Sequence, residues 1–159
     1  MPTIPKGFQP VVEGYSMDDP GGVMRTEVAG GAARYALDWA RGPQRFTVTL
    51  ILDSDQFAIW QAFYFYAIKK GAIAFDMPLD SGFGVANHSV NIMPGSYSAA
   101  RTSGVMMVIS FVVEAESMVY ALGEDGATAL LDLHDEYGAY AAGLIARLAR
   151  FATVDTLVL

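Results

Sequence analysis

Hydrophobic side chains alternate with polar or small ones in two neighbouring stretches of the first third of the chain. The first stretch carries Tyr35, Leu37 and Trp39, and the second carries Phe46, Val48, Leu50 and Leu52. A spacing of two residues is typical of strands that bury one face. Residues 40–44, Ala-Arg-Gly-Pro-Gln, lie between the stretches and contain the glycine and proline typical of a turn. The pattern therefore predicts a β-hairpin.

The spacing changes to that of a helix at residue 53. Asp53 or Ser54 can accept hydrogen bonds from the first free N–H groups of a helix, and Gln56 completes a loose capping box. Lys69-Lys70 complements the negative end of the helix dipole, and Gly71 is a typical terminating residue. These signals predict a helix over residues 54–70. Its apolar face contains Phe57, Trp60, Phe63, Tyr64 and Ala67.

Further strand-like stretches follow the predicted helix, near residues 73–77, 88–93, 97–101 and 105–114, with a loop at 80–87. The uninterrupted apolar run of the last stretch indicates that both its faces are covered, by a second sheet or by a neighbouring chain. The order of hairpin, helix and strands is typical of an α+β domain, which we place at residues 23–116. We expect its core to contain Trp39, Phe46, Val48, Leu50, Phe57, Trp60, Phe63, Tyr64 and Phe75.

Both ends of the chain differ from this domain. Residues 1–22 are rich in proline, which prevents a helix, so we expect an extended N-terminal arm with a short strand near 11–15. Residues 23–28 form a weak strand candidate at the start of the domain. Beyond residue 116 the sequence predicts a C-terminal helical extension, 117–159, with a turn at 122–126 and a helix over 128–151.

The predicted helix 128–151 has a wide apolar stripe. Its opposite face consists mostly of alanine and glycine with few charges, so the helix is poorly suited to standing free in water. We expect the stripe to contact another chain, and the alternative is that the helix folds back onto its own sheet. The stripe contains Tyr137, Tyr140, Leu144, Ile145, Leu148 and Phe151.

The composition is acidic and poor in charge. The 159 residues carry a net charge of −7, and 17% of them are charged, against about 25% in a typical soluble domain. This composition excludes a disordered chain and a protein that binds duplex DNA by neutralising its phosphates. The longest apolar and uncharged tract, 57–68, is shorter than the roughly 20 residues that span a bilayer, so we expect no membrane partner. The apolar excess fits either a subunit covered by neighbours or a small, well-packed domain.

No pattern of side chains points to catalysis. The chain has no cysteine, which excludes disulfides and thiolate chemistry. His88 and His134 lack the spacing of a metal site, and consecutive residues 134–136 point in different directions on a helix. Residues 81–84 contain two glycines but not the third glycine of a dinucleotide-binding fingerprint. We therefore expect no catalytic residue, no metal and no cofactor.

An ordered set of short motifs runs through residues 34–113, about half of the chain. It consists of Arg45-Phe-Thr-Val-Thr-Leu50, Trp60 with Phe63-Tyr64, Gly71, Phe75-Asp-Met-Pro-Leu79, His88-Ser-Val90, Met93-Pro-Gly-Ser-Tyr97 and Gly104. In this order the motifs resemble the small minor tail proteins of long-tailed bacteriophages, the lambda-type distal-tail family. Met106-Met107 stands where we expect tryptophan in relatives, and the chain beyond Glu116 lies outside the shared pattern.

The resemblance implies a tail-tube-like β-sandwich with a flanking helix. It also implies a structural virion protein, made in the host cytoplasm, whose homo-oligomer is a hexameric ring at the tail tip between the tail tube protein and the hub proteins. DNA would pass through the lumen without specific binding, and an acidic subunit suits such a conduit. The alternatives are a tail tube or tail-terminator ring subunit, and a small hydrolase or ligand-binding domain with a site near His88.

Overall fold

The computed structural model describes residues 1–102, 104–140 and 143. The chain separates into two units, Met1–Met118 and Val119–Leu159, close to the boundary predicted at residue 116. The first unit contains an antiparallel sheet with a helical segment packed on it, and the second contains a helix. This is the α+β composition that the sequence predicts.

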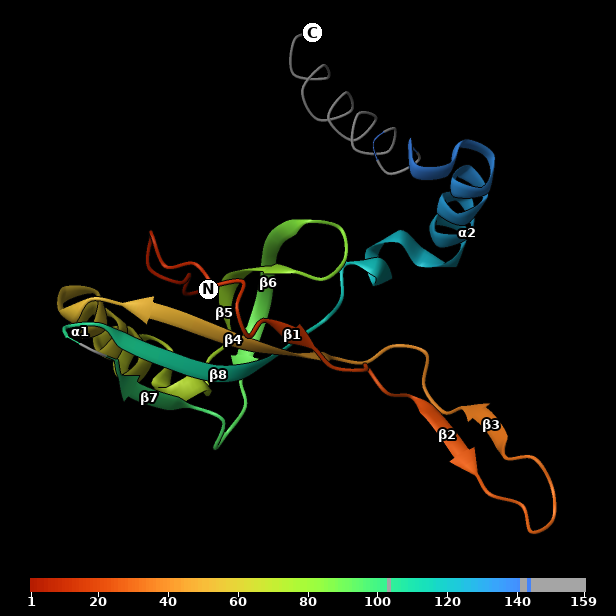
Figure 1. Ribbon diagram of the computed structural model, residues 1–159, viewed down its shortest axis with the longest axis horizontal. Helices are drawn as coiled ribbons and strands as arrows, with labels where there is room; N and C mark the ends of the chain where they lie inside the picture. The colour runs from red at the N-terminus through yellow and green to blue at the C-terminus, as the bar shows by residue number, and fades with distance from the viewer. Residues whose placement is uncertain (103, 141–142, 144–159) are drawn as a thin grey trace, which may run out of the picture. The chain divides into compact units, whose positions relative to one another are not determined.

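Six strands of the first unit form one antiparallel sheet (Figure 1). Its order is β1-β4-β8-β6-β5, and β7 shares one edge of β8 with β6. The longest pairing aligns β4 with β8 over the full length of both strands. The tail-tube-like β-sandwich stays a prediction. The six strands are β1 (Ser16–Met17), β4 (Gln44–Leu52), β5 (Phe75–Asp80), β6 (Val85–Ile92), β7 (Ser98–Arg101) and β8 (Met107–Ala115).

Every second side chain of β4 lies in the hydrophobic core, as the spacing of two predicts. β8 follows the same alternation, with one buried face and one half-buried face. The predicted cover by a second sheet is not present among the described residues, and cover of the half-buried face by a neighbouring chain stays a prediction. The core contains Ile4, Phe8, Phe46, Val48, Leu50, Leu52, Trp60, Phe63, Ile68, Phe75, Met77, Leu79, Val90, Ile92, Ile109, Phe111, Val113 and Ala115.

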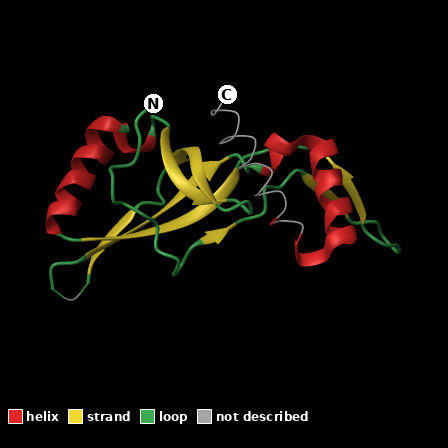
Figure 2. Ribbon diagram, turned by 90° about the horizontal axis from the view of Figure 1, so that it is seen from above, coloured by secondary structure: helices red, strands yellow, loops and turns green. Residues whose placement is uncertain are grey.

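The helical segment after β4 begins at the predicted cap. The Asp53 carboxylate accepts the N–H of Gln56 at 2.8 Å, and the Gln56 side chain accepts the N–H of Asp53 at 3.1 Å. Both bonds of a capping box are therefore present. Figure 2 shows the segment lying along one side of the sheet.

The same segment changes its helix type before it ends. α1 (Ser54–Ala62) is followed by the π-helical turn η1 (Phe63–Ala67) and the 3-10 turn η2 (Lys69–Gly71). The span matches the predicted 54–70, although only its first part is α-helical. Gly71 has a φ of +92°, and a Cβ there would lie 2.8 Å from the Cβ of Ile92. Only glycine satisfies both constraints.

Trp60 is the centre of the packing between this segment and the sheet. Its side chain is fully buried and stacks on Phe111 of β8 with 5.4 Å between ring centroids. The indole N–H donates to the Tyr97 hydroxyl at 3.1 Å. Phe63 is buried beside it, and the two other predicted core residues of the segment, Phe57 and Tyr64, are half-buried against the core.

Residues 23–37 form a separate two-stranded hairpin. β2 (Val23–Thr26) pairs antiparallel with β3 (Arg34–Leu37), and every residue of both strands is exposed. The prediction that 35–39 pairs with 46–52 is therefore wrong, since β1 and β8 flank β4. Trp39 is 52% exposed, so its predicted place in the core is wrong as well. Alternating side chains show that a strand has one apolar face, but not which surface covers it.

The second unit contains α2 (Val119–Tyr137) and the 3-10 turn η3 (Gly138–Tyr140). Gly123 interrupts α2 with a φ of 67° and a ψ of 179°, inside the turn predicted at 122–126. Gly138 follows α2 with a φ of 59°, a conformation that an α-helix cannot contain. The predicted uninterrupted helix over 128–151 is therefore wrong at Gly138.

The predicted interface stripe falls only partly on described residues. Tyr137 and Tyr140 are exposed. The other members of the stripe, Leu144, Ile145, Leu148 and Phe151, lie outside the described residues, so its contact with another chain stays a prediction. Among the described helices, none is both long and apolar enough to cross a bilayer.

Candidate functional site

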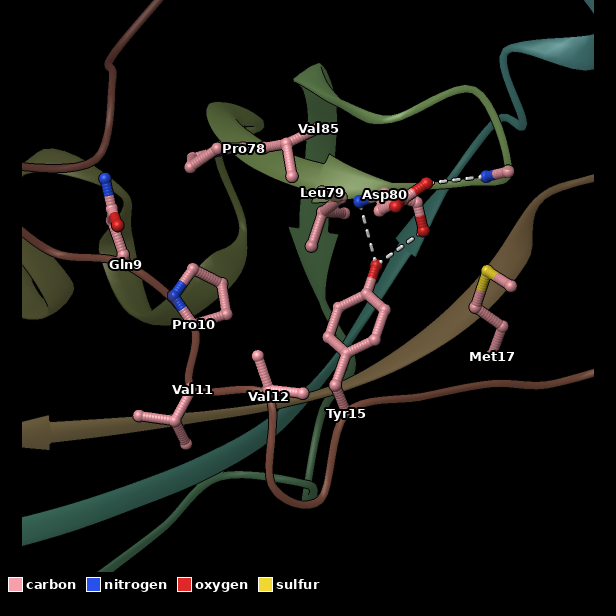
Figure 3. Close-up of a pocket in the computed structure, with 11 residues that line it drawn as sticks. Gln9, Pro10, Val11, Val12, Tyr15, Met17, Pro78, Leu79, Asp80 and Val85 are labelled. Carbon is pink, nitrogen blue, oxygen red and sulfur yellow. Dashed lines mark hydrogen bonds between the residues drawn. The ribbon is translucent and has the colours of Figure 1, made fainter. Parts of the chain in front are cut away.

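A largely apolar groove of about 710 Å³ lies between the N-terminal arm and the edge of the sheet (Figure 3). One wall consists of arm residues 9–17. The other wall consists of the end of β5 and the start of β6. The groove is lined by Gln9, Pro10, Val11, Val12, Tyr15, Met17, Pro78, Leu79, Asp80, Gly82 and Val85.

Backbone hydrogen bonds hold the arm in place along the groove. The Val11 N–H donates to the Thr49 carbonyl of β4 at 2.9 Å, and the Tyr15 N–H donates to the Val12 carbonyl at 3.2 Å. The arm is extended and non-helical at this point, as predicted. The short strand predicted near 11–15 forms instead as β1, because the chain makes a turn between Val12 and Tyr15 before it pairs with β4.

β5 is the outer strand at one end of the sheet, and three alternating positions on its free edge are not available to a further strand. Asp76 donates its N–H to the Pro2 carbonyl at 2.8 Å and accepts the N–H of Ile4 at 2.9 Å. Pro78 has no N–H to offer, and Asp80 is bonded to the hydroxyl of Tyr15. A proline on an outer edge removes no ladder hydrogen bond. β5 therefore runs on through Pro78, and the loop predicted at 80–87 is shortened to residues 81–84.

The Tyr15 hydroxyl makes the two backbone hydrogen bonds at Asp80 that a neighbouring strand would otherwise make. It donates to the Asp80 carbonyl at 2.8 Å and accepts the Asp80 N–H at 3.1 Å (Figure 3). Burial raises the pKa of Tyr15, the hydrogen bond with the Asp80 backbone lowers it, and the Asp80 carboxylate raises it again. The net shift of this pKa is upward. The hydroxyl is therefore protonated at neutral pH and can keep both bonds.

A buried serine–histidine pair lies next to Gly82 of the groove. His88 Nδ1 is 2.8 Å from the Ala86 carbonyl, and His88 Nε2 is 3.0 Å from Ser81 Oγ. Because a carbonyl only accepts, His88 Nδ1 donates to Ala86, and Nε2 shares the second hydrogen bond with the Ser81 hydroxyl. Ser81 Oγ in turn accepts the N–H of Met118 at 3.1 Å. The chain of bonds joins the loop 81–84 to β6 and to the end of the first unit.

This pair lacks what a serine nucleophile needs. Catalytic serine–histidine pairs have an accessible Oγ and a carboxylate that orients the imidazole. Here Ser81 is 9% exposed and His88 is 4% exposed, and the third partner is a backbone carbonyl. The geometry is that of a buried structural hydrogen-bond network, and it gives no support to a hydrolase site near His88. Within the described part of the chain, no three His, Asp or Glu side chains gather where they could hold a metal ion.

A second apolar surface lies on the β2–β3 hairpin. Val23 lies opposite Leu37 and Arg25 opposite Tyr35, so these side chains share one face. Trp39 follows two residues after the end of β3, and its ring lies near Gly21, Gly22 and Gly42. We call Val23, Tyr35, Leu37 and Trp39 the hairpin face. Their exposed fractions are 61%, 68%, 68% and 52%. Large apolar side chains that are exposed side by side mark an interaction surface.

Sequence reasoning identified neither surface. The groove combines residues from the arm, β5 and β6, and no local pattern indicates that these segments meet. The apolar run Pro10-Val11-Val12 within the predicted extended arm is the available signal. For the hairpin face, the alternation of Tyr35, Leu37 and Trp39 predicts a strand correctly, but the predicted pairing with residues 46–52 and the predicted core position of Trp39 are wrong.

No family model, curated protein or solved structure matches this chain.

Proposed function

We propose that this chain is a structural virion subunit of a bacteriophage tail, with no catalytic role and no cofactor. In this proposal it forms a hexameric ring at the tail tip that joins the tail tube to the hub and encloses the DNA channel. The observation that carries the proposal is the hairpin face, which exposes large apolar side chains on strands that no other described strand pairs with. The resemblance of residues 34–113 to minor tail proteins supplies the kind of assembly.

Burial of the hairpin face against another surface would stabilise it, because its apolar side chains are exposed to water. An isolated hairpin of two strands is at best marginally stable in water, so both its strands and its apolar face gain from a partner. A ring provides every subunit with the same neighbour on each side, and it therefore covers such a face in all copies at once. An assembled structural protein is a better explanation of this surface than a monomeric domain.

The fold of the first unit is compatible with the proposal. A tail-tube-like β-sandwich is part of what we propose, and its support is limited to an antiparallel sheet with one helical segment packed on the core side. The alternative of a tail tube or tail-terminator subunit would use the same fold. These alternatives differ in how the rings associate with one another.

The charge of the chain supports a channel that DNA passes without binding. The net charge is −7. Three arginines are already paired with carboxylates: Arg25 with Glu27 at 2.7 Å, Arg41 with Glu116 at 2.9 Å and Arg45 with Glu114 at 3.3 Å. The 17 Asp and Glu residues outnumber the 10 Lys and Arg residues, so the chain offers little net basic surface for DNA, and retention of DNA would be weak at physiological salt.

Mass measurement and electron microscopy of the full chain test the proposal. Sedimentation should give a species several times heavier than the 17.1 kDa subunit, and micrographs should show closed rings. Stacked tubes would favour the tail tube alternative. A 17.1 kDa monomer at all concentrations, or tight DNA binding at physiological salt, would contradict the ring and the conduit respectively.

A further inference from the structure

The outward face of the helical segment after β4 is apolar, like the face that packs on the sheet. Ile59 is 53% exposed and Tyr66 is 84% exposed, and Ala62 is exposed between them. No charged residue lies between Asp55 and Lys69. A helix on the surface of a globular domain carries polar and charged side chains on its outward face. This segment therefore has a second apolar face, which is open to a partner.

Five exposed residues of this face form a regular stripe. Successive members are four, three, four and three residues apart, which is the spacing of the contact positions in paired helices. The π-helical turn η1 does not interrupt the stripe, since Tyr66 within it and Lys69 beyond it are both exposed. We call these residues the helix stripe: Asp55, Ile59, Ala62, Tyr66 and Lys69.

The helix stripe is complementary to a second copy of itself that runs in the opposite direction. Reversal about Ala62 places Asp55 opposite Lys69 and Ile59 opposite Tyr66, and each of these pairs then occurs twice in one contact. The small Ala62 side chains meet at the centre, where they permit a short distance between the helix axes. A parallel arrangement would place like charges opposite each other, which opposes association.

The two charged ends of the helix stripe have no partner within their own chain. Neither Asp55 nor Lys69 forms an ion pair with another described residue. They are fourteen residues apart on one helical segment, roughly 20 Å at the rise of a helix, so they cannot pair with each other. A second copy in the antiparallel direction supplies both missing charges at once.

We infer that two copies of this chain pair through their helix stripes, antiparallel and around a two-fold axis. Such a contact uses the same surface on both subunits, whereas a cyclic ring joins two different surfaces. The contact therefore lies outside the proposed ring, and it would join a subunit of one ring to a subunit of another. The inference goes beyond the proposed function and does not depend on it.

A single cysteine at the two-fold axis tests the contact directly, because the chain has no cysteine of its own. In the full-length Ala62→Cys protein the two thiols would face each other, and oxidation should give the disulfide dimer at least about tenfold faster than in a matched control. Ala58→Cys is the control, since Ala58 is an exposed alanine of the same helix. Its two copies would lie eight residues apart along the helix pair, roughly 12 Å, which exceeds the reach of a disulfide.

Reversal of the charges at the two ends tests the direction of the pairing. Asp55→Lys and Lys69→Asp should each weaken dimerisation roughly tenfold in sedimentation, because each contact contains the pair twice. The double variant, Asp55→Lys with Lys69→Asp, should restore it. A loss caused by a weaker helix would not be restored, since the helix dipole favours an acidic start and a basic end. Circular dichroism checks that all three variants are folded.

The outcomes separate this inference from the proposed function. Equal rates of disulfide formation in the Ala62→Cys and Ala58→Cys proteins would overturn the inference, and closed rings seen with that result would leave the ring standing. Single reversals without effect, or a double reversal that restores nothing, would overturn it as well, because another partner must then cover the helix stripe. A preferred Ala62→Cys disulfide in a chain that forms dimers but no rings would support the inference and contradict the ring.

Discussion

Replacing Trp60 by alanine should remove a large part of the stability of the first unit. The side chain is fully buried between the helical segment and the sheet. Its ring lies 5.4 Å from that of Phe111 and 5.8 Å from that of Phe63, and its N–H donates to Tyr97. The ring also contacts Phe8 at 6.4 Å and Tyr64 at 6.3 Å. Truncation therefore leaves a cavity, removes four aromatic contacts and breaks one hydrogen bond.

The expected magnitude follows from these contacts. Truncation of a buried aromatic residue costs about 3–5 kcal/mol, and aromatic pairs add about 0.5–1.5 kcal/mol beyond the area they bury. The Tyr97 hydroxyl keeps the Gln61 amide as a second donor at 3.4 Å, so it is not left without a partner. We expect a loss of about 4–5 kcal/mol, which is a large fraction of the roughly 5–15 kcal/mol typical of folded domains.

Trp39→Ala is the matched control, because the chain contains two tryptophans and only Trp60 is buried. Partial burial of Trp39 predicts a loss of about 1 kcal/mol. Urea unfolding followed by circular dichroism should separate the two variants by about 1–3 M in midpoint at an ordinary slope. Each curve is recorded at two protein concentrations about tenfold apart, since assembly makes apparent stability depend on concentration. Equal losses for the two variants would refute the assignment of Trp60 to the core.

Three further substitutions test local features of the first unit. Asp53→Ala should cost about 1 kcal/mol in urea unfolding through loss of the capping box, whereas Asp55→Ala, which has no such bond, should cost less than about half of that. Gly71→Ala should destabilise the first unit more than Gly30→Ala. Both glycines have a positive φ, but of the two only residue 71 would place the new Cβ against another residue, Ile92. Equal losses of stability would refute the role of Ile92. Because burial raises the pKa of Tyr15 above its ordinary value of 10, the contribution of its hydroxyl should be constant below about pH 10 and decline as pH rises beyond it. The stability difference between the unmodified chain and Tyr15→Phe should shrink in that range. A difference that grows with pH would show that folding lowers the pKa of Tyr15, contrary to the expected direction.

Local signals predicted the elements whose structure is decided by their own residues. The capping box at Asp53, the stop at Gly71 and the alternation in β4 all match the structure, because each depends on backbone hydrogen bonds or sterics within a few residues. The break in α2 at Gly123 was also predicted from local residues, the turn at 122–126. Gly138 shows the converse, since its positive φ ends a helix that periodicity alone extends to Phe151.

The sequence by itself determined where most strands and the helix after residue 53 form, and which side chains of a strand share a face. Only the tertiary structure decided which strand pairs with which, and therefore which apolar faces are covered. Tyr35, Leu37 and Trp39 carry the same alternation as Phe46, Val48 and Leu50, yet the first set is exposed and the second is buried. The physical reason is that periodicity reflects the geometry of one strand, whereas burial depends on contacts between residues far apart in the chain. The groove has the same origin, because the bonds of Ile4 to Asp76 and of Tyr15 to Asp80 bring the arm to an edge that no local pattern specifies.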